Sequence, residues 1–86
     1  NKKMADDEVI DLLSELTFNM KDYNKSLKYS NLYIVWKPRD VNKLFIKAES
    51  LYELWKINDS LNTYKRILDL QPYNTKAKET IKNIEN

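Results

Sequence analysis

Two prolines, Pro38 and Pro72, lie 34 residues apart in a chain that has no other proline and no glycine. Proline ends a preceding helix, because its ring removes a hydrogen-bond donor and restricts the residue before it. Two positions after each proline stands Asp40 or Asn74, whose side chain accepts hydrogen bonds from the free N–H groups at a helix start. The two segments therefore predict the same event twice, the end of one helix and the start of the next.

The rest of the sequence repeats at the same spacing, which is the signature of a helical-repeat architecture. A shift of 34 residues aligns residues of similar type at most apolar and small positions. The aligned pairs include Ile10 with Leu44, Ser14 with Ala48, Phe18 with Tyr52, Ser26 with Ser60, Leu27 with Leu61, and Ile34 with Leu68.

Apolar residues at helical spacing divide each unit into two helices. Leu44, Ala48 and Leu51 form one stripe in the second unit, and we expect Trp55 to continue it as a buried residue. The expected helices cover residues 5–18, 23–36, 41–54, 58–70 and 75–85, with Asn58 or Asp59 as the cap of the fourth. Other expected core residues are Trp36, Tyr64, Ile67, Leu68 and Leu70. Ala77, Ile81 and Ile84 form an apolar face that has to be buried. We expect it to pack on the second unit as a cap, or else against a further repeat or a dimer partner.

The composition limits the chain to one small domain with few chemical options. The 86 residues are 42% hydrophobic and 33% charged, too apolar for a disordered chain and too polar for a membrane-spanning one. Without Cys, His or Gly, the chain lacks thiolate nucleophiles, imidazole bases and phosphate-cradling glycine loops. We expect no enzyme activity, no cofactor and no metal site. The formal net charge of +2 gives no reason to expect nucleic acid as a partner.

The N-terminal residues give two further expectations. Residues 1–8 contain no apolar stretch, so no signal sequence is expected and a cytoplasmic location is predicted. The chain starts at Asn1 rather than Met, which is expected either of a fragment of a larger protein or of a processed product.

These residues resemble the tetratricopeptide repeat family, whose 34-residue pattern is W-x2-L-G-x2-Y, then A-x3-F, then P. The second unit matches it with Leu44, Lys47-Ala48, Leu51, Ser60, Tyr64 and Pro72, and the first with Ile10, Leu13-Ser14, Thr17, Ser26, Ser30 and Pro38. The family's glycine is missing, and Lys21 and Trp55 stand where the chain turns between helices. The resemblance implies an all-α right-handed superhelix of antiparallel helix hairpins. Repeat one covers about 7–40, repeat two about 41–74, and a capping helix about 75–86.

The resemblance also implies that the first helices of successive units line a concave groove where a protein partner binds. The candidate partner-binding residues carried over from the family's groove positions are Asp11, Glu15, Phe18, Phe45, Glu49, Tyr52 and Glu53. With Glu8 and Glu79, these positions hold six carboxylates against one lysine, Lys76. The sequence thus predicts an acidic groove with aromatic anchors and a basic opposite surface.

The same positions argue against a clamp for an acidic chaperone tail, which some family members form with groove Lys, Arg and Asn side chains. Asn42 stands in place of the clamp lysine and Ile46 in place of the clamp arginine. Nearby carboxylates would repel the tail by about 1 kcal/mol or more at intermediate dielectric. We therefore expect a basic or amphipathic segment, docked as a helix in the groove.

Several alternatives stay open. The acidic residues can form an ordinary solvated face, and the three aromatic residues can pack between repeats. The chain can be the non-catalytic tail of a co-chaperone or of an immunophilin-type prolyl isomerase. Exposed ends of the stack and the two tryptophans can also support self-association, so a homodimer stays open. The second helices carry basic residues that we expect to be solvated rather than bound to RNA or lipid: Lys25, Lys28, Lys65 and Arg66.

Overall fold

A computed structural model describes residues 2–86, which fold into five α-helices with no strand among them. The helices are α1 (Lys2–Asn19), α2 (Tyr23–Trp36), α3 (Val41–Glu53), α4 (Ile57–Leu70) and α5 (Thr75–Glu85). The predicted all-α class and the five helices are confirmed, and each helix end lies within three residues of its expected position. Over residues 2–86, none of the helices combines the length and the apolar character that crossing a membrane requires.

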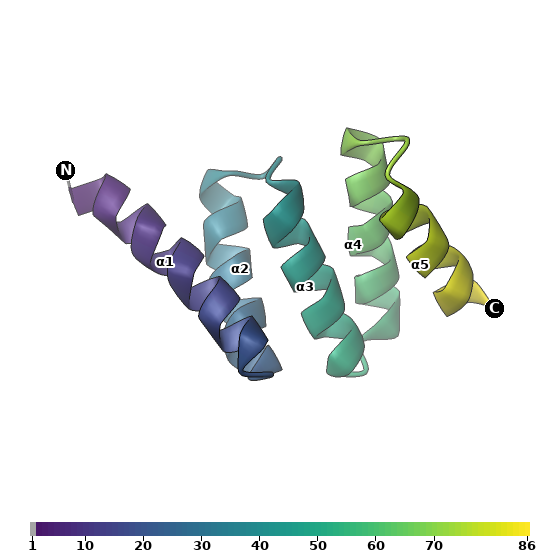
Figure 1. Ribbon diagram of the computed structural model, residues 1–86, viewed down its shortest axis with the longest axis horizontal. Helices are drawn as coiled ribbons and strands as arrows, with labels where there is room; N and C mark the ends of the chain where they lie inside the picture. The colour runs from purple at the N-terminus through teal and green to yellow at the C-terminus, as the bar shows by residue number, and fades with distance from the viewer. Residues whose placement is uncertain (1) are drawn as a thin grey trace.

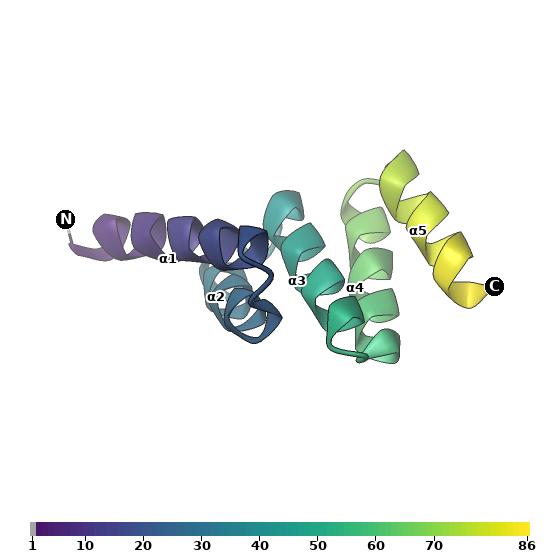
Figure 2. The ribbon, with the colours of Figure 1, turned by 60° about the horizontal axis from the view of Figure 1, so that its bottom comes forward.

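The helices stack in chain order, so that neighbours in sequence are neighbours in space (Figure 1). α1 packs on α2, α2 on α3, α3 on α4 and α4 on α5, and α1 also contacts α3. The body measures 45 × 25 × 17 Å, and its two termini lie at opposite ends of the long axis (Figure 1). The turned view shows the same order of helices along that axis (Figure 2). This succession of nearest-neighbour contacts is the arrangement of a helical repeat.

The two proline segments end and start helices as predicted. Asp40 Oδ1 accepts a hydrogen bond from the backbone N–H of Lys43 at 3.0 Å, which caps α3. Asn74 Oδ1 accepts one from the N–H of Ala77 at 2.9 Å, which caps α5. Each cap satisfies one of the donors that a helix start leaves free.

The start of α4 differs from the expectation. The helix begins at Ile57, one residue earlier than expected, and no side chain caps it. Asn58 and Asp59, the predicted caps, therefore lie inside the helix, where Asp59 still places its charge favourably in the first turn.

Each helix hairpin turns through one residue with a left-handed backbone, Lys21 (φ 63°) and Trp55 (φ 64°), again 34 residues apart. The N–H that follows each turn residue, in Asp22 or Lys56, donates to a carbonyl five residues earlier at 2.9 Å. Trp55 therefore leaves the α3 stripe and is 86% exposed. The prediction that it is buried is wrong, because the left-handed turn directs the side chain away from the helix face that it was expected to continue.

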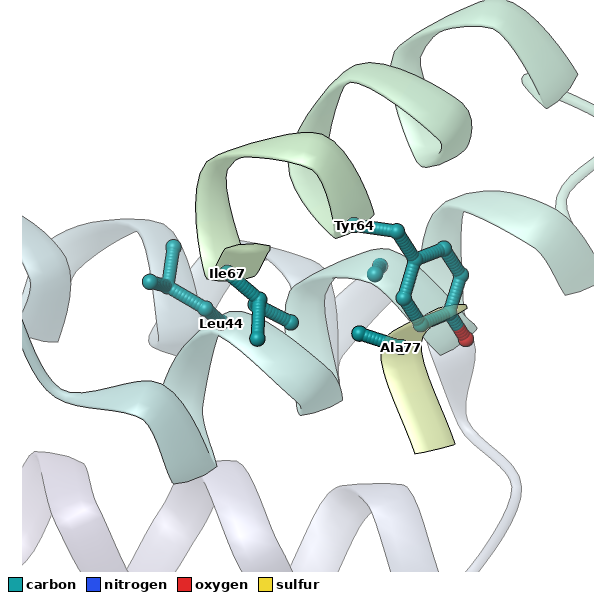
Figure 3. Packing of buried hydrophobic residues seen from close by; sticks show 5 residues of the cluster. Leu44, Tyr64, Ile67 and Ala77 are labelled. Atoms are coloured by element: carbon teal, nitrogen blue, oxygen red, sulfur yellow. The ribbon is translucent and has the colours of Figure 1, made fainter. Parts of the chain in front are cut away.

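The apolar core lies mainly in the second half of the chain. Its centre consists of Leu44, Ala48, Tyr64, Ile67 and Ala77, contributed by α3, α4 and α5 (Figure 3). The partly buried residues packed against this cluster include Leu68, Leu70, Ile81 and Ile84. The predicted core residues of α4 are thus confirmed. The apolar side of α5 packs against the second unit, which is the first of the two alternatives expected for it. Trp36, by contrast, is exposed at the end of α2.

Small residues allow the helices to approach closely, as the repeat pattern predicts. The serines with no exposed surface are Ser14, Ser26, Ser30, Ser50 and Ser60. Each buried hydroxyl needs a partner. Those of Ser26 and Ser50 lie 2.6 Å apart and join α2 to α3, and that of Ser60 donates to the carbonyl of Ala48 at 2.8 Å.

Candidate functional site

The candidate site is the surface formed by α1, α3 and α5, here called the first-helix face. Contacts between side chains link these three helices although they are not consecutive. Lys43 of α3 bonds to two carboxylates of α1, and Lys76 of α5 reaches Glu49 of α3. A hollow of about 260 Å³ lies between α1 and α3, lined by Glu15, Phe18, Asn19, Asn42 and Ile46.

Lys43 is the centre of the charges between α1 and α3. Its side chain is only 3% exposed, and its ammonium forms ion pairs with Asp11 and, at 2.9 Å, with Glu15. The ammonium also lies 5.1 Å from the centre of the Tyr33 ring of α2. A buried lysine is stable only when such partners replace its lost hydration.

The same partners determine how Lys43 titrates. Burial alone lowers the pKa of its ammonium, because the charged form loses solvation. The hydrogen bonds that the ammonium donates to Asp11 and Glu15, together with the negative charge of these carboxylates, outweigh that effect and hold the pKa above the ordinary lysine value. Lys43 is therefore a fixed positive charge of the fold at neutral pH.

The groove carries less negative charge than the sequence predicted, because Lys43 is paired with two of its carboxylates. The groove positions predicted from the sequence hold six carboxylates and one lysine, Lys76. The structure adds Lys43, which neutralises part of the charge of Asp11 and Glu15 from within the protein. These two side chains remain 44% and 56% exposed, so their outer oxygens are still accessible.

The acidic residues on α3 and α5 differ in how they are paired. Glu49 lies 3.8 Å from Lys76, whose ammonium also lies 4.8 Å from the centre of the Phe45 ring. Glu53 and Glu79 are exposed, and within the described part of the chain neither makes a close ion pair. They are the carboxylates most available to a partner.

The three predicted aromatic anchors occupy different environments. Phe45 packs edge-on against Tyr64 with ring centres 6.0 Å apart, and Phe18 packs in the same way against Tyr23. Both are partly buried and belong to the packing between helices. Tyr52 is 46% exposed and is the aromatic side chain most accessible on this face. Whether any of the seven predicted residues contacts a partner stays a prediction.

The burial of Lys43 at this face was not predicted, although the sequence contains an indication of it. In the 34-residue alignment Lys43 corresponds to Val9 and Ala77, so it is a charged residue at an apolar or small position. Such a residue is buried only with compensating charges. The acidic pair spaced four residues apart on α1, Asp11 and Glu15, supplies them.

The chemistry of this face is that of a binding surface. Its functional groups are carboxylates, lysine ammonium groups and aromatic rings at half-exposed positions. Among the described residues, no group of three or more acidic residues is placed to hold a metal ion. The chain matches no protein-family model, and the search of curated proteins finds no relative of it.

Proposed function

We propose that the chain is a tetratricopeptide-type protein-interaction module, with repeats at about 7–40 and 41–74 and a capping helix at about 75–86. In this proposal it acts by binding, without catalysis, as part of a larger protein. Its partner is a basic or amphipathic segment that docks as a helix on the first-helix face. The 34-residue alignment, the buried small residues and the stacked hairpins support the family assignment.

The observation that carries the proposal is the pairing of charges on this face. Both lysines near it, Lys43 and Lys76, are already engaged with carboxylates. The exposed carboxylates of Glu53 and Glu79 and the outer oxygens of Asp11 and Glu15 remain for a ligand. From residue 6 onwards, where side chains are described, this face has unpaired acceptors and no lysine without a carboxylate beside it, so it attracts basic side chains and repels acidic ones.

The apolar part of the ligand meets Tyr52 and the hollow between α1 and α3. Tyr52 is a rigid amphipathic side chain of the type enriched among binding hot spots. The hollow is lined by the apolar side chains of Phe18 and Ile46 together with the polar ones of Glu15, Asn19 and Asn42. An amphipathic helix with Lys or Arg beside a Leu stripe matches both features.

The structure also determines which substitutions test the proposal cleanly. Reversing the charge of Asp11 and Glu15 places like charges against the buried Lys43, so lost binding would be confounded with lost stability. Glu53 avoids this problem, because it is exposed at the last residue of α3. A lysine there even interacts favourably with the helix dipole.

The test uses a synthetic helical peptide of about 18 residues with a Lys/Arg face and a Leu face, measured by fluorescence anisotropy. We expect Glu53→Lys and Tyr52→Ala each to weaken binding about three- to tenfold, the range of one exposed charge or one anchor. The matched control is Asp69→Lys, an equal change of net charge on α4, which should leave the affinity unchanged. Equal effects of Glu53→Lys and Asp69→Lys would show only general charge attraction and refute the proposed face.

Self-association is the second candidate function, and a specific observation favours it. α1 exposes a row of large apolar side chains at the end of the stack, while α5 at the other end exposes charged ones.

A further inference from the structure

The first helix of each unit presents an equivalent stripe of residues toward the preceding helices. In α3, Ser50 hydrogen-bonds to Ser26 of α2, and Lys43 bonds to α1 and lies against Tyr33 of α2. In α5, Ala77 is buried against the α4 residues of the core. These stripes, spaced three and four residues apart, are Lys43, Ile46 and Ser50 in α3 with Leu54 at its C-cap, and Ala77, Thr80 and Ile84 in α5.

The equivalent stripe of α1 is uncovered. It consists of Val9, Leu12, Leu16 and Met20, which we call the end stripe, and these side chains are 52%, 67%, 49% and 68% exposed. At 3.6 residues per turn Val9, Leu12 and Leu16 lie on one side of α1, and Met20, which directly follows the helix, continues that side because its N–H still donates to the carbonyl of Leu16 at 3.0 Å. That side faces away from the helix face that holds Asp11 and the buried Ser14, with Glu15 to one side of it. α1 forms one end of the long axis, with no other helix of the described chain beyond it (Figure 1).

The end stripe is also the most apolar of the three. Its counterpart in α3 contains a lysine and a serine, and that in α5 a threonine, whereas all four end-stripe residues are large and hydrophobic. A contiguous exposed apolar surface marks an interaction site. Repeat stacks need polar outer surfaces at their ends. α5 has such a surface, with Lys78, Lys82 and Glu85 exposed, and α1 does not.

We propose that the end stripe binds the end stripe of a second copy of this chain, with the two α1 helices antiparallel about a two-fold axis. The spacing of the stripe is nearly symmetric about its middle. Antiparallel pairing places Val9 against Met20 of the second copy and Leu12 against Leu16 of the second copy, and each contact occurs twice.

Charges at the two ends of the stripe specify both the partner and the direction. Glu8 precedes the stripe and Lys21 follows it, and both are exposed. Antiparallel pairing brings Glu8 of each copy to Lys21 of the other, whereas parallel pairing brings like charges together. Because the charges at the two ends of the stripe are opposite, the surface is complementary to a second copy of itself in the antiparallel orientation. A second copy of the chain is therefore the partner that this surface matches.

The contact is small, since it rests on four partly exposed side chains on each copy, and it therefore belongs to the weak class of interfaces. The first experiment is analytical ultracentrifugation of the 86-residue chain from about 5 to about 500 µM. We expect a concentration-dependent monomer–dimer equilibrium. Leu12→Glu with Leu16→Glu should weaken the dimer at least tenfold and leave the helical circular dichroism signal unchanged.

The matched control replaces two exposed apolar residues of α2, Leu32→Glu with Val35→Glu, and should dimerise like the wild type. A wild-type chain that stays monomeric over the whole range overturns the proposal. So does a dimer that survives substitution of the end stripe, or one lost equally in the control. A separate helical hairpin as the true occupant would appear as a monomeric wild type.

Cross-linking tests the direction, because the chain has no cysteine of its own. Val9→Cys and Met20→Cys are prepared separately, mixed and oxidised. Antiparallel pairing predicts a disulfide mainly between the two different variants. Self-cross-linking of Val9→Cys at least as strong as the mixed product, or no cross-link at all, overturns the proposed arrangement.

This inference goes beyond the proposed groove function and fails separately from it. Glu53→Lys should weaken binding of the basic peptide without changing dimerisation. Substitution of the end stripe should weaken the dimer at least tenfold and leave the peptide affinity of the monomer within about twofold, since the stripe lies on the side of α1 away from α3.

Discussion

The two junctions between units of the stack occupy equivalent positions but are built from different chemistry. At the first junction, where α3 meets α1 and α2, Lys43 sits among two carboxylates and a tyrosine ring, and Ser26 bonds to Ser50. At the second, where α5 meets α4, the residue equivalent to Lys43 is Ala77, buried in the apolar core.

Equivalent positions of the two junctions thus hold a buried lysine in one case and a buried alanine in the other. Both choices allow the helices to pack closely, so the stacked arrangement does not depend on one particular set of contacts. The second junction owes most of its stability to apolar burial, and the ion pairs that cross it, Lys76–Glu49 and Lys65–Glu85, are largely exposed and contribute little. The ion pairs at the first junction depend on pH and salt, and they use carboxylates of the candidate binding face. Ligand binding and stability are therefore coupled strongly at the first junction, and only weakly at the second, where Glu49 of the candidate face makes an exposed pair with Lys76.

The largest expected effect is loss of apolar packing at the second junction. Ile67 has no exposed surface, so Ile67→Ala should lower the free energy of unfolding by about 2–5 kcal/mol. The counterpart at the first junction is Ser26→Ala, which removes one buried hydrogen bond and should cost about 1 kcal/mol. Urea unfolding measures both, and a larger loss for Ser26→Ala would contradict the assignment of the core to the second half.

Lys43→Met tests the polar junction itself. The change keeps the side-chain volume but leaves Asp11 and Glu15 without their cation, and should cost about 1–2 kcal/mol because both carboxylates can rehydrate. The same change frees these carboxylates and should tighten binding of the basic peptide several-fold. Its control is Lys76→Met, at an exposed pair, which should change stability by less than about 1 kcal/mol. Tighter binding from Lys76→Met alone would argue against the role of Lys43.

Alkaline pH should weaken the first junction through the same lysine. The pKa of Lys43 is raised in the folded protein, so its contribution is complete below the unfolded pKa of about 10.4 and is lost as pH rises through the higher folded value. The stability difference between wild type and Lys43→Met should therefore shrink above about pH 10.5. Burial raises the pKa of Tyr64 as well, which weakens wild type and variant alike. Thermal melts across this range check the prediction, and a difference that stays constant with pH would contradict it.

The smallest effect should appear at the hairpin turns, which are alike in the two units. Lys21 and Trp55 both have positive φ, a conformation that costs a non-glycine residue about 1–2 kcal/mol. Lys21→Gly and Trp55→Gly should therefore each stabilise the chain, by about 0.5–1 kcal/mol after the greater backbone entropy of glycine is subtracted. Thermal unfolding measures this gain, and destabilisation by Trp55→Gly would show that the exposed indole makes a stabilising contact.

Local signals predicted most of the fold. Pro38 and Pro72 ended helices, Asp40 and Asn74 capped the next ones, and the small residues marked the close contacts. Trp55 was mispredicted because, without glycine in the chain, a tryptophan occupies the left-handed turn position that glycine usually takes.

The site was harder to predict, because its electrostatics depend on contacts distant in sequence. Asp11 and Lys43 are 32 residues apart, and only the stacking of α1 against α3 brings them together. Counting charges along one helix face therefore overestimated the free negative charge. The positions of Glu53 and Tyr52, which follow from one helix alone, needed no such correction.

Two peptides of opposite charge show whether the first-helix face binds a basic amphipathic helix. One carries a Lys/Arg face and the other a Glu/Asp face on the same Leu stripe, and each is titrated at about 20 mM and about 500 mM salt. We expect the basic peptide to bind with an affinity that falls strongly as the salt concentration rises, and the acidic peptide not to bind at either concentration. Preferential binding of the acidic peptide, or basic-peptide binding that salt leaves unchanged, would contradict it.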